Sequence, residues 1–416
     1  MDITSLFSVA LHIAEPWFIS ELDFDPIEKV LRVSVDFRRG AKFEVAEEDS
    51  AGSTGLYSAY DTTQKEWRHL NFFEHACYLK ARVPRVKNKA GKVRVIDPPW
   101  SGRVHGLTEF LEAYVLLLVQ KMPVKSVSSL LKISDSKIWE VVKRYVEAGR
   151  AIEVFDTITT IGIDETSQKK HHDYISLFVD LDKKRTVFVG QGKAATVVRD
   201  FKKDLVAHLG DPNQITDVSC DMSPAFIRGV KENLPEAAIT FDKFHIVKLI
   251  NEAVDKVRRD EVIRTPLLRN TRYLFLKNRT NLTAGQDRAL QGLEMSELNL
   301  KTIQAYHIKE NFKAIYEAHD LDEFKQLLTK WYIWASTSEL PPMVDVAQTI
   351  MRHWDGVVEW KRSQINNGIL EGLNSVIQAA KAKARGYRNF EYFKAIVYLI
   401  TGKLDLGAIN PYYQPT

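Results

Sequence analysis

Three carboxylates occupy positions from which they could support metal-dependent chemistry: Asp164, Asp221 and Glu371. Asp164 ends the apolar, β-branched run at residues 157–165, and Asp221 ends a second run at residues 215–221. A lone aspartate at such a position can simply cap a turn, so the pair is more informative than either residue. Strand ends at one edge of a sheet converge, and two ionised carboxylates held there repel unless a divalent cation neutralises them. The pair therefore predicts a metal site suited to hydrolysis.

The third carboxylate lies in a predicted helix at residues 365–378. Its polar face carries, at spacings i, i+3, i+4 and i+7, the side chains of Glu371, Asn374, Ser375 and Gln378. A run of bases without an acid follows: Lys381, Lys383, Arg385 and Arg388. Taken alone, this segment is equally compatible with an ordinary amphipathic helix that carries one glutamate.

The elements that must position the aspartates form a recognisable order. Residues 157–165, 174–181 and 186–190 predict three consecutive antiparallel strands. A helix at 194–209, a strand at 215–221, a helix at 222–233 and a strand at 237–241 follow. This is the order of the ribonuclease H-like fold. Residues 252–335 are helical and charged, residues 336–342 form a loop, and we expect no strands in this segment.

The N-terminal hundred residues predict a β-rich domain with a basic face. Residues 30–45 favour a β-hairpin that turns at 38–40, and residues 67–86 and 92–96 continue the β pattern. Residues 1–25 show no clear period. Basic residues gather between 82 and 103, where Arg85, Lys87 and Lys89 lie, and such a cluster suits a polyanion if it is more than solvated surface.

Helical periodicity begins at residue 107 and predicts a helix-turn-helix. The first helix covers 107–120, a short second one begins at Pro123, and a third follows Ser134, its expected N-cap. We expect the buried face to comprise Val127, Leu130, Leu131, Ile138, Val141, Val142 and Tyr145. The exposed face of the third helix would carry Asp135, Ser136, Lys137, Trp139, Glu140 and Lys143 toward a major groove. The glycine usual in the turn of this motif is missing, and Lys132 lies near its expected position. The alternative to a DNA-binding helix-turn-helix is a helical hairpin inside a larger domain.

Composition excludes several other classes of protein. The 416 residues carry a net charge of +4, with 45% hydrophobic and 27% charged residues, as in ordinary globular proteins. No apolar run approaches the roughly 20 residues of a membrane span, and the N-terminus lacks the pattern of a secretory signal. Cys77 and Cys220 are too few for a disulfide framework and indicate a reducing compartment. Residues 190–195 mimic a dinucleotide fingerprint, but they follow an antiparallel strand.

The motifs at 162–165, 220–223 and 371–375 together resemble the DDE transposases of bacterial insertion sequences, most closely the ISL3 family. Residues 242–245 resemble the Asp-x-x-His signature of such enzymes, and residues 384–390 resemble the family segment after the catalytic glutamate. Residues 67–70 and the helix-turn-helix at 123–148 match in the same order, so the resemblance covers nearly the whole chain.

The resemblance implies a DNA transposase that hydrolyses phosphodiesters at transposon ends and then transfers strands. Its catalytic and metal-binding residues would be Asp164, Asp221 and Glu371, holding two Mg²⁺ ions for which Mn²⁺ can substitute. Its partners would be double-stranded DNA of the transposon ends and the target, bound by a homodimer or higher oligomer. It would act in the bacterial cytoplasm at the nucleoid, without a membrane. The expected DNA-binding residues are Lys137, Trp139, Lys143, Arg85, Lys87, Lys89, His245, Asn374, Lys381, Lys383, Arg385 and Arg388.

We therefore predict an α+β multidomain chain. Its parts would be a β-rich N-terminal DNA-binding domain (1–100), a helix-turn-helix domain (104–150), a ribonuclease H-like α/β catalytic core (155–250 and 361–405) and an all-α insertion (251–360). Two other functions stay open: a DNA-binding repressor with an inactive ribonuclease H-like body, and a resolving nuclease of the same fold.

One feature departs from the family. The resemblance implies an N-terminal zinc domain with two Cys-x-x-Cys-Gly knuckles, yet the matching segments, residues 48–52 and 87–91, keep only their glycines. Structural zinc needs four soft or imidazole ligands, so we predict no zinc. Packing should hold this region instead, through Trp67, Phe72, Phe73 and Tyr78, with Glu48 pairing with Lys87.

Overall fold

The computed structural model describes residues 2–46, 54–168, 174–296, 298–365 and 368–414 and shows an α+β protein with two sheets. By internal contacts the chain forms two compact units, residues 1–153 with 376–416, and residues 154–375. The division falls inside helix α14 (Gly368–Lys383). The sequence interpretation had grouped residues 361–405 with the catalytic core, whereas contacts group residues from 376 onward with the N-terminal part.

The N-terminal sheet has the strand order β1-β2-β5-β4-β3, with β6 added beside β5. One short helix precedes it, and the elements are α1 (Ile3–Ala10), β1 (Trp17–Asp25), β2 (Val30–Phe37), β3 (Lys42–Ala46), β4 (Thr54–Phe72), β5 (His75–Lys87) and β6 (Val93–Val95). The predicted β character of this region is confirmed. Residues 47–53 lie outside the described part of the chain, and with them the expected knuckle at 48–52 and its Glu48.

The predicted hairpin between residues 30 and 45 is wrong, although both of its strands exist. Strand β2 pairs with β1 on one edge and with β5 on the other, so neither edge is free for β3. Strand β4, with 19 residues, extends past β5, and β3 pairs with this extension, Phe43 opposite Tyr57. Alternation of apolar residues specifies which face of a strand is buried, but not which strand lies beside it.

Aromatic side chains fill the core of this sheet. Trp100 packs against Trp17 and Trp67, with ring centroids 5.2 Å and 5.9 Å away. The predicted aromatic packing is confirmed for Trp67, which is buried, and for Phe72, which contacts the ring of Phe7 in α1. It is wrong for Phe73, which is 85% exposed because its φ of 50° places it in the turn between β4 and β5. The Tyr78 ring instead stacks under the guanidinium of Arg68.

The predicted helix-turn-helix is present as α2 (Glu109–Lys121), α3 (Val124–Leu131) and α4 (Asp135–Ala151). Lys132 takes the left-handed conformation of the turn, with φ 54°, where glycine is usual. Of the expected inward residues only Leu130 is wrong, being 54% exposed. Ser134 is the N-cap of α4 by position, but its hydroxyl contacts that of Ser136 and makes no capping bond.

The second unit contains a five-stranded sheet in the order β11-β10-β7-β8-β9. Its strands β7, β8 and β9 are antiparallel, as predicted, and β10 and β11 run parallel to β7. The elements are β7 (Thr160–Ser167), β8 (Tyr174–Asp180), β9 (Arg185–Gln191), α5 (Ala195–Ala207), β10 (Asp217–Cys220), α6 (Pro224–Asn233) and β11 (Ala238–Phe241).

One expectation about this sheet is corrected: Asp164 does not end its strand. Strand β7 continues to Ser167 because β8 pairs with it throughout, with Leu177 opposite Asp164. Gly162 lies two residues before Asp164, on the same face of β7, and its lack of a side chain allows helix α14 to pack closely on the strand. A Cβ at Gly162 would lie 2.9 Å from the side chains of Leu181 and Leu370, so any larger residue there would push α14 away.

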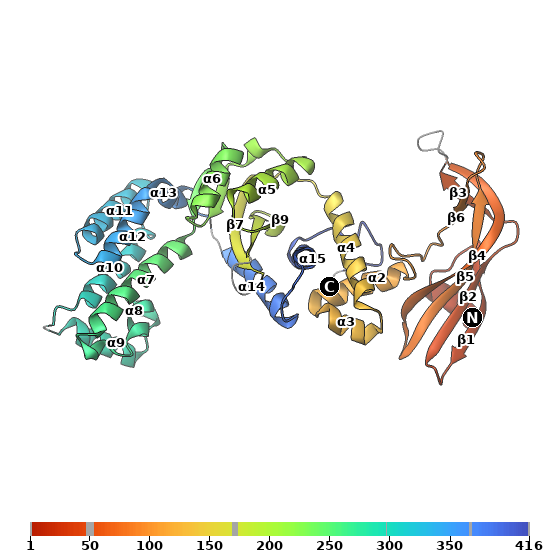
Figure 1. Ribbon diagram of the computed structural model, residues 1–416, viewed down its shortest axis with the longest axis horizontal. Helices are drawn as coiled ribbons and strands as arrows, with labels where there is room; N and C mark the ends of the chain where they lie inside the picture. Colours follow the sequence, from red (N-terminus) through yellow and green to blue (C-terminus); the bar gives the residue numbers. More distant parts are fainter. Residues whose placement is uncertain (1, 47–53, 169–173, 297, 366–367, 415–416) are drawn as a thin grey trace. The chain divides into compact units, whose positions relative to one another are not determined.

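The predicted all-helical segment is confirmed: the described residues between 243 and 363 contain helices and no strand (Figure 1). Its α-helices are α7 (Lys243–Val262), α8 (Arg272–Leu276), α9 (Ala284–Glu294), α10 (Lys301–Ile315), α11 (Leu321–Ser336), α12 (Pro341–Arg352) and α13 (Trp354–Ser363). Their buried side chains continue the hydrophobic core of the sheet. Helix α15 (Phe390–Thr401) follows α14 and packs against α4 of the first unit.

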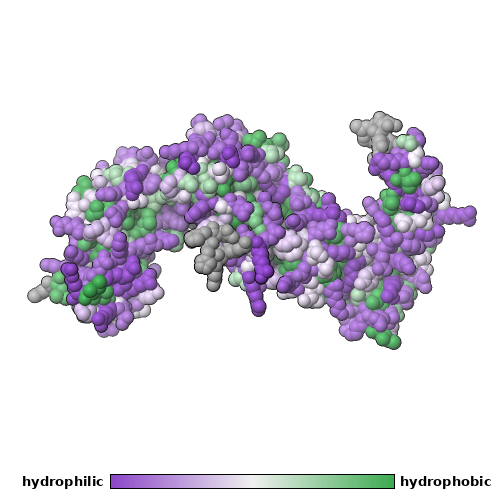
Figure 2. Space-filling model, in the orientation of Figure 1, coloured by the Kyte–Doolittle hydropathy of each residue, from purple (hydrophilic) through white to green (hydrophobic). Residues whose placement is uncertain are grey.

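The visible surface is mostly hydrophilic, and apolar residues lie on it in scattered patches (Figure 2). Among the described helices, none has the length and hydropathy needed to span a bilayer.

Candidate functional site

Three aspartates lie level with one another at one edge of three adjacent strands, Asp164 within β7, and Asp221 and Asp242 directly after β10 and β11. In the pairing of β10 with β7, Ser219 stands opposite Gly162. Asp221 comes two residues after Ser219, and Asp164 comes two residues after Gly162. In the pairing of β10 with β11, Cys220 stands opposite Phe241, and the next residues are Asp221 and Asp242. These three strands are parallel, so their carboxyl ends point to one edge of the sheet. The predicted meeting of Asp164 and Asp221 at this edge therefore follows from the register.

The electrostatics of this aspartate edge reflect burial and, less strongly, neighbouring negative charge. Burial raises the pKa of Asp164 above its usual value, and the carboxylates of Asp242 and Asp221 act in the same direction. The backbone N–H of Glu165 and the imidazole of His245 oppose this rise in pKa. Burial likewise raises the pKa of Glu165, against the attraction of Lys193. Burial, with a smaller contribution from neighbouring carboxylates, thus disfavours the ionised forms of Asp164 and Glu165.

Each aspartate of the edge is held by one backbone N–H. The N–H of Glu165 donates to Oδ1 of Asp164 at 2.8 Å, that of Ser223 to Asp221 at 3.0 Å, and that of Phe244 to Asp242 at 2.8 Å. Asp242 caps helix α7 in this way, and Nε2 of His245 lies 3.8 Å from its other oxygen. One oxygen of each carboxylate is thereby oriented by the fold, which fixes the direction of the second.

Helix α14 contributes Asn374 to this edge. The side-chain amide of Asn374 donates a hydrogen bond to Oδ2 of Asp164, and its own Oδ1 is buried without a partner among the described residues. Glu371 lies one helical turn before Asn374 on the same face and is exposed. Among the described residues, no group of three His, Cys, Asp or Glu side chains is assembled as a metal site. The structure therefore joins Asp164 and Asp221, and places Glu371 on the adjoining helix.

The donor set of the edge fits a hard divalent cation. Carboxylate and amide oxygens are the ligands that Mg²⁺ prefers, and the unpartnered Oδ1 of Asn374 is one more oxygen facing this region. A cation would also favour the ionised form of Asp164, whose pKa is raised by burial and, to a smaller extent, by the carboxylates of Asp242 and Asp221. The thiol of Cys220 takes no part, because it is fully buried and burial raises its pKa. Sequence reasoning left Asp242 out of the site; its place at the end of the 237–241 run was the available signal.

The structure distinguishes among the predicted DNA-binding residues of α4. Lys137 lines a groove of about 410 Å³ together with Arg68, His105 and Lys132. Trp139, by contrast, stacks on Tyr392 of α15 with ring centroids 4.1 Å apart and planes 4° from parallel. Lys143 lies over the same Tyr392 ring, 5.4 Å from its centroid. The aromatic face of Trp139 is thus used inside the fold, and Lys137 is the better placed of the three.

The basic residues of β5 also differ from one another. Arg85 forms a two-bond ion pair with Asp61 on β4, which neutralises it within the sheet. Lys87, the last residue of β5, and Lys89, in the tight turn that follows, are both exposed. The Nζ of Lys87 lies 5.8 Å from the centroid of the Tyr60 ring. The side chain and backbone carbonyl of Asn88 hold this turn together by accepting the N–H groups of Lys92 and Gly91. Of the two segments expected to match zinc knuckles, this one, residues 87–91, lies in the described part of the chain.

The predicted bases after Glu371 lie at the C-terminal end of α14 and beyond it. Lys383, Arg385 and Arg388 are exposed. Lys381 is half-buried, and burial lowers its pKa. Arg385 takes a left-handed conformation with φ 57°, which ends the helix.

Comparisons with known proteins give matches over most of the chain. The DDE transposase profile of the ISL3 type, described as "Transposase", matches residues 161–397, more than half of the chain. The profile "Helix-turn-helix domain of transposase family ISL3" matches residues 96–146. The chain is 27% identical over 349 residues to the transposase for insertion sequence element IS1001 of Bordetella parapertussis, covering 80% of this chain and 84% of that one. It is also 27% identical over 364 residues to the transposase for element IS1557 of Mycobacterium tuberculosis, covering 80% and 81%.

Proposed function

Because the chain belongs to the ISL3 family of transposases, we propose that it binds the terminal inverted repeats of an insertion sequence and catalyses metal-dependent DNA cleavage and strand transfer. The observation that carries this proposal is the level register of Asp164 and Asp221 on adjacent parallel strands. Two half-buried carboxylates at that spacing have little structural benefit, since their mutual repulsion costs stability unless a cation occupies the edge.

The strand order supports a ribonuclease H-like catalytic core. Three antiparallel strands are followed by two parallel ones in the order β11-β10-β7-β8-β9, and helices α5 and α6 connect them. In this interpretation helices α7 to α13 form an insertion between the second aspartate and Glu371. The proposed catalytic carboxylates are then Asp164, Asp221 and Glu371.

Two Mg²⁺ ions, when bound, would supply neutralisation of phosphate charge and an activated water or 3′-hydroxyl. The residues that would hold them are the same three carboxylates. The chain itself contributes orientation: the backbone N–H groups of Glu165 and Ser223 fix one oxygen of each aspartate. Asn374 ties the helix that carries Glu371 to Asp164. In-line displacement at phosphorus needs this fixed arrangement of charge more than any covalent protein group.

Recognition of the DNA would come from the N-terminal unit. The helix-turn-helix places Lys137 on the first turns of α4, where base contacts are made in this motif. Lys87, Lys89, Lys383, Arg385 and Arg388 are exposed cations suited to phosphates. We expect a dimer or higher oligomer on DNA, because two transposon ends must be brought together for strand transfer.

The deciding experiment incubates the full chain with DNA that carries the two ends of its own element, with and without Mg²⁺. We expect cleavage at the ends and joining of the 3′ ends to target DNA, both only with the metal. Binding without cleavage would support a repressor, and cleavage without joining would support a resolving nuclease. Either result would overturn the proposal.

A further inference from the structure

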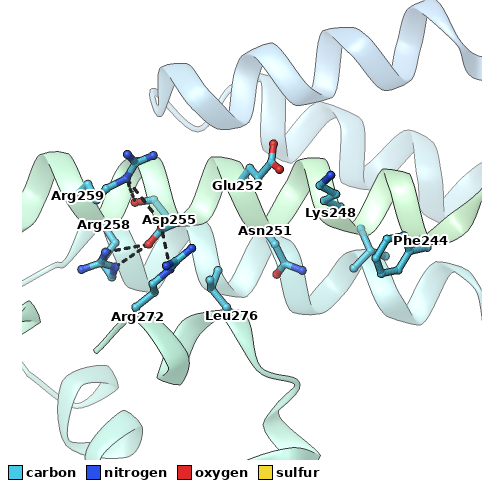
Figure 3. A pocket seen from close by; sticks show the side chains of 10 residues that line it. Phe244, Lys248, Asn251, Glu252, Asp255, Arg258, Arg259, Arg272 and Leu276 are labelled. Atoms are coloured by element: carbon cyan, nitrogen blue, oxygen red, sulfur yellow. Dashed lines mark hydrogen bonds and ion pairs between the residues drawn. The ribbon is translucent and has the colours of Figure 1, made fainter. Parts of the chain in front are cut away.

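A basic groove lies along helix α7 (Figure 3). Its volume is about 510 Å³. The α7 residues that line it recur every three or four positions, on one face of the helix, and α8 adds Arg272 and Leu276. The groove carries four cations, Lys248, Arg258, Arg259 and Arg272, against two carboxylates, Glu252 and Asp255.

One buried carboxylate organises three of the four cations. Asp255, whose side chain is 13% exposed, accepts from Arg258 at 2.9 Å and lies 3.5 Å from Nε of both Arg259 and Arg272 (Figure 3). Arg258 is itself buried and uses both its Nε and an Nη nitrogen on Asp255. A single carboxylate cannot neutralise three guanidiniums, so the groove keeps a positive excess.

The two outer arginines face solvent with their terminal nitrogens unused. The side chains of Arg259 and Arg272 are 64% and 56% exposed. The shortest contact of each with Asp255 is through Nε, at 3.5 Å, and among the described residues no hydrogen bond comes from an Nη of either arginine. The guanidinium of Arg272 also lies 5.9 Å from the centroid of the Tyr273 ring. A guanidinium held by Nε presents its Nη groups as a fixed fork, which matches the oxygens of a phosphate. Lys248 adds an exposed cation with no ion pair in the described part of the chain.

Two further side chains of the groove, those of Asn251 and Phe244, have a polar atom or a ring surface available to a ligand. Oδ1 of Asn251 is buried with no hydrogen-bond partner among the described residues, although the amide points into the groove. Phe244, at the start of α7, exposes 55% of its surface there. An amide and an aromatic ring in a basic channel are the usual supplements to phosphate contacts in nucleic-acid binding.

We propose that this groove binds the sugar–phosphate backbone of DNA whose neighbouring segment lies at the aspartate edge. Asp242 is the N-cap of α7, so the helix that carries the groove begins at that edge. From Phe244 to Arg259 the helix rises roughly 22 Å, which matches about six nucleotides of one strand. The inference rests on the proposed function for the identity of the DNA, while the phosphate groove itself depends only on the contacts above.

The first test compares two variants of equal charge. Arg259→Gln with Arg272→Gln removes the outer forks, and Arg288→Gln with Arg352→Gln removes two exposed arginines of the same helical segment outside the groove. Fluorescence anisotropy with a labelled duplex at several salt concentrations gives affinity and salt dependence for the full chain. We expect the groove variant to bind about tenfold more weakly and its salt slope to fall by about 2, with little change in the control. Equal behaviour of the two variants overturns the proposal.

A second measurement locates the DNA directly. Both native thiols are buried and burial raises the pKa of each, so a cysteine introduced at an exposed position is the reactive one. A photo-crosslinker attached at Glu252→Cys should link the duplex, whereas one at Asp322→Cys on α11 should not. Crosslinking at position 252 without any cleavage in Mg²⁺ would uphold the groove and overturn the proposed transposase activity. Absence of crosslinking at 252 in a chain that cleaves its ends would overturn the groove alone. An acidic protein segment as the true ligand would give the same negative result with DNA.

Discussion

Asn374 donates its side-chain amide to Oδ2 of Asp164, two residues that are 210 positions apart in the chain. The bond links helix α14 to the central strand of the second sheet. Leu370 strengthens the link by packing against Val179 and Leu181, beside Gly162. Because Glu371 is adjacent to Leu370 and one turn before Asn374, these contacts determine where the third proposed carboxylate stands.

Replacing Asn374 by alanine should therefore weaken catalysis through loss of this positioning. We expect Asn374→Ala to lower cleavage of transposon ends by roughly 10- to 100-fold, the usual cost of removing a residue that orients a metal ligand. The loss should be largest at limiting Mg²⁺ and shrink as Mg²⁺ is raised. Ser375→Ala, a change of the exposed neighbouring residue, serves as the control. A titration in which Asn374→Ala follows the unmodified protein at every Mg²⁺ concentration would remove Asn374 from this role.

The three carboxylates should be required for chemistry but not for binding. Asp164→Asn, Asp221→Asn and Glu371→Gln should each reduce cleavage by about 10³-fold or more, since phosphoryl transfer depends on the charge they hold. End binding should change by less than about threefold, because phosphate contacts elsewhere supply the affinity. Gel assays of cleavage and of binding on the same DNA make the comparison, with Asp322→Asn as a surface control. Normal cleavage by any one variant would exclude that residue from the site.

Two kinds of lysine should differ in their effect on DNA binding. Lys137→Ala should reduce the preference for end sequence over random DNA by about 1–3 kcal/mol, as expected for a base contact from α4. Lys87→Ala with Lys89→Ala should weaken binding to all duplexes and lower the salt slope. Arg85→Ala should have less effect than replacing either Lys87 or Lys89, because Asp61 already neutralises Arg85. Competition titrations at several salt concentrations test all three sets of variants. A sequence preference unchanged by Lys137→Ala would argue against α4 as the helix that contacts the bases.

This experiment is best done on the full chain. Inside the first unit, Asn410 donates to the hydroxyl of Tyr145, which in turn donates to the buried carboxylate of Glu112. The same carboxylate accepts the N–H groups of Arg103 and Val104, in the segment before α2. A fragment that ends near residue 150 would lack Asn410 and the Tyr392 ring against Trp139, and would leave buried polar and aromatic groups unpaired.

The local sequence pattern predicted most of the helices and strands. It did not predict which distant segments pair or pack with one another. Runs of β-branched residues and their turns predicted β7 to β11 in order, and apolar periodicity predicted α2 to α5. The pairing of β3 with β4 rather than with β2 depended on which strand edge was left free. The contact of Trp139 with Tyr392 joins side chains from opposite ends of the sequence. Periodicity gives the buried face of an element, but the partner on that face is chosen by the whole fold.

The same limit applies to the candidate site. The two strand-borne aspartates could be paired from sequence because parallel strands share an edge. Asp242 follows the 237–241 run in the sequence, but only the pairing of β10 with β11 shows that it lies level with Asp221. The role of Asn374 was predicted as DNA binding, whereas in the structure its amide contacts Asp164.

The N-terminal sheet should be stable without zinc and sensitive to its tryptophans. Trp100→Ala should cost about 3–5 kcal/mol of unfolding free energy, because it removes a buried ring that packs on Trp17 and Trp67. Phe73→Ala should stay within about 0.5 kcal/mol, since this side chain is 85% exposed. Chelators should leave the unfolding transition unchanged, and elemental analysis should find no stoichiometric zinc. One zinc per chain that survives dialysis would contradict this prediction.

The helical segment should become more stable as pH rises, because of one buried lysine. Lys309 is 2% exposed, and its Nζ donates to the carbonyl of Lys277 at 2.9 Å and to that of Phe275. Burial lowers the pKa of Lys309 from 10.5 to about 8, while the nearby Glu310 opposes that shift. Between these two values the unfolded chain retains a proton that the folded chain releases, so the free energy of unfolding rises with pH. This stabilisation, on the order of 3 kcal/mol, is complete above pH 10.5 and is lost as pH falls through 8.

Hydrogen exchange of peptides from α10, corrected for the intrinsic effect of pH, measures this directly. We expect protection to increase from about pH 7.5 to about pH 9.5 in the unmodified protein. Lys309→Met should abolish the increase and lower protection at both pH values, because the carbonyls of Phe275 and Lys277 lose their donor. Lys330→Met, which changes an exposed lysine of α11, should keep it. If Lys309→Met retained the pH-dependent gain, another group would have to carry it, and the low pKa of Lys309 would be wrong.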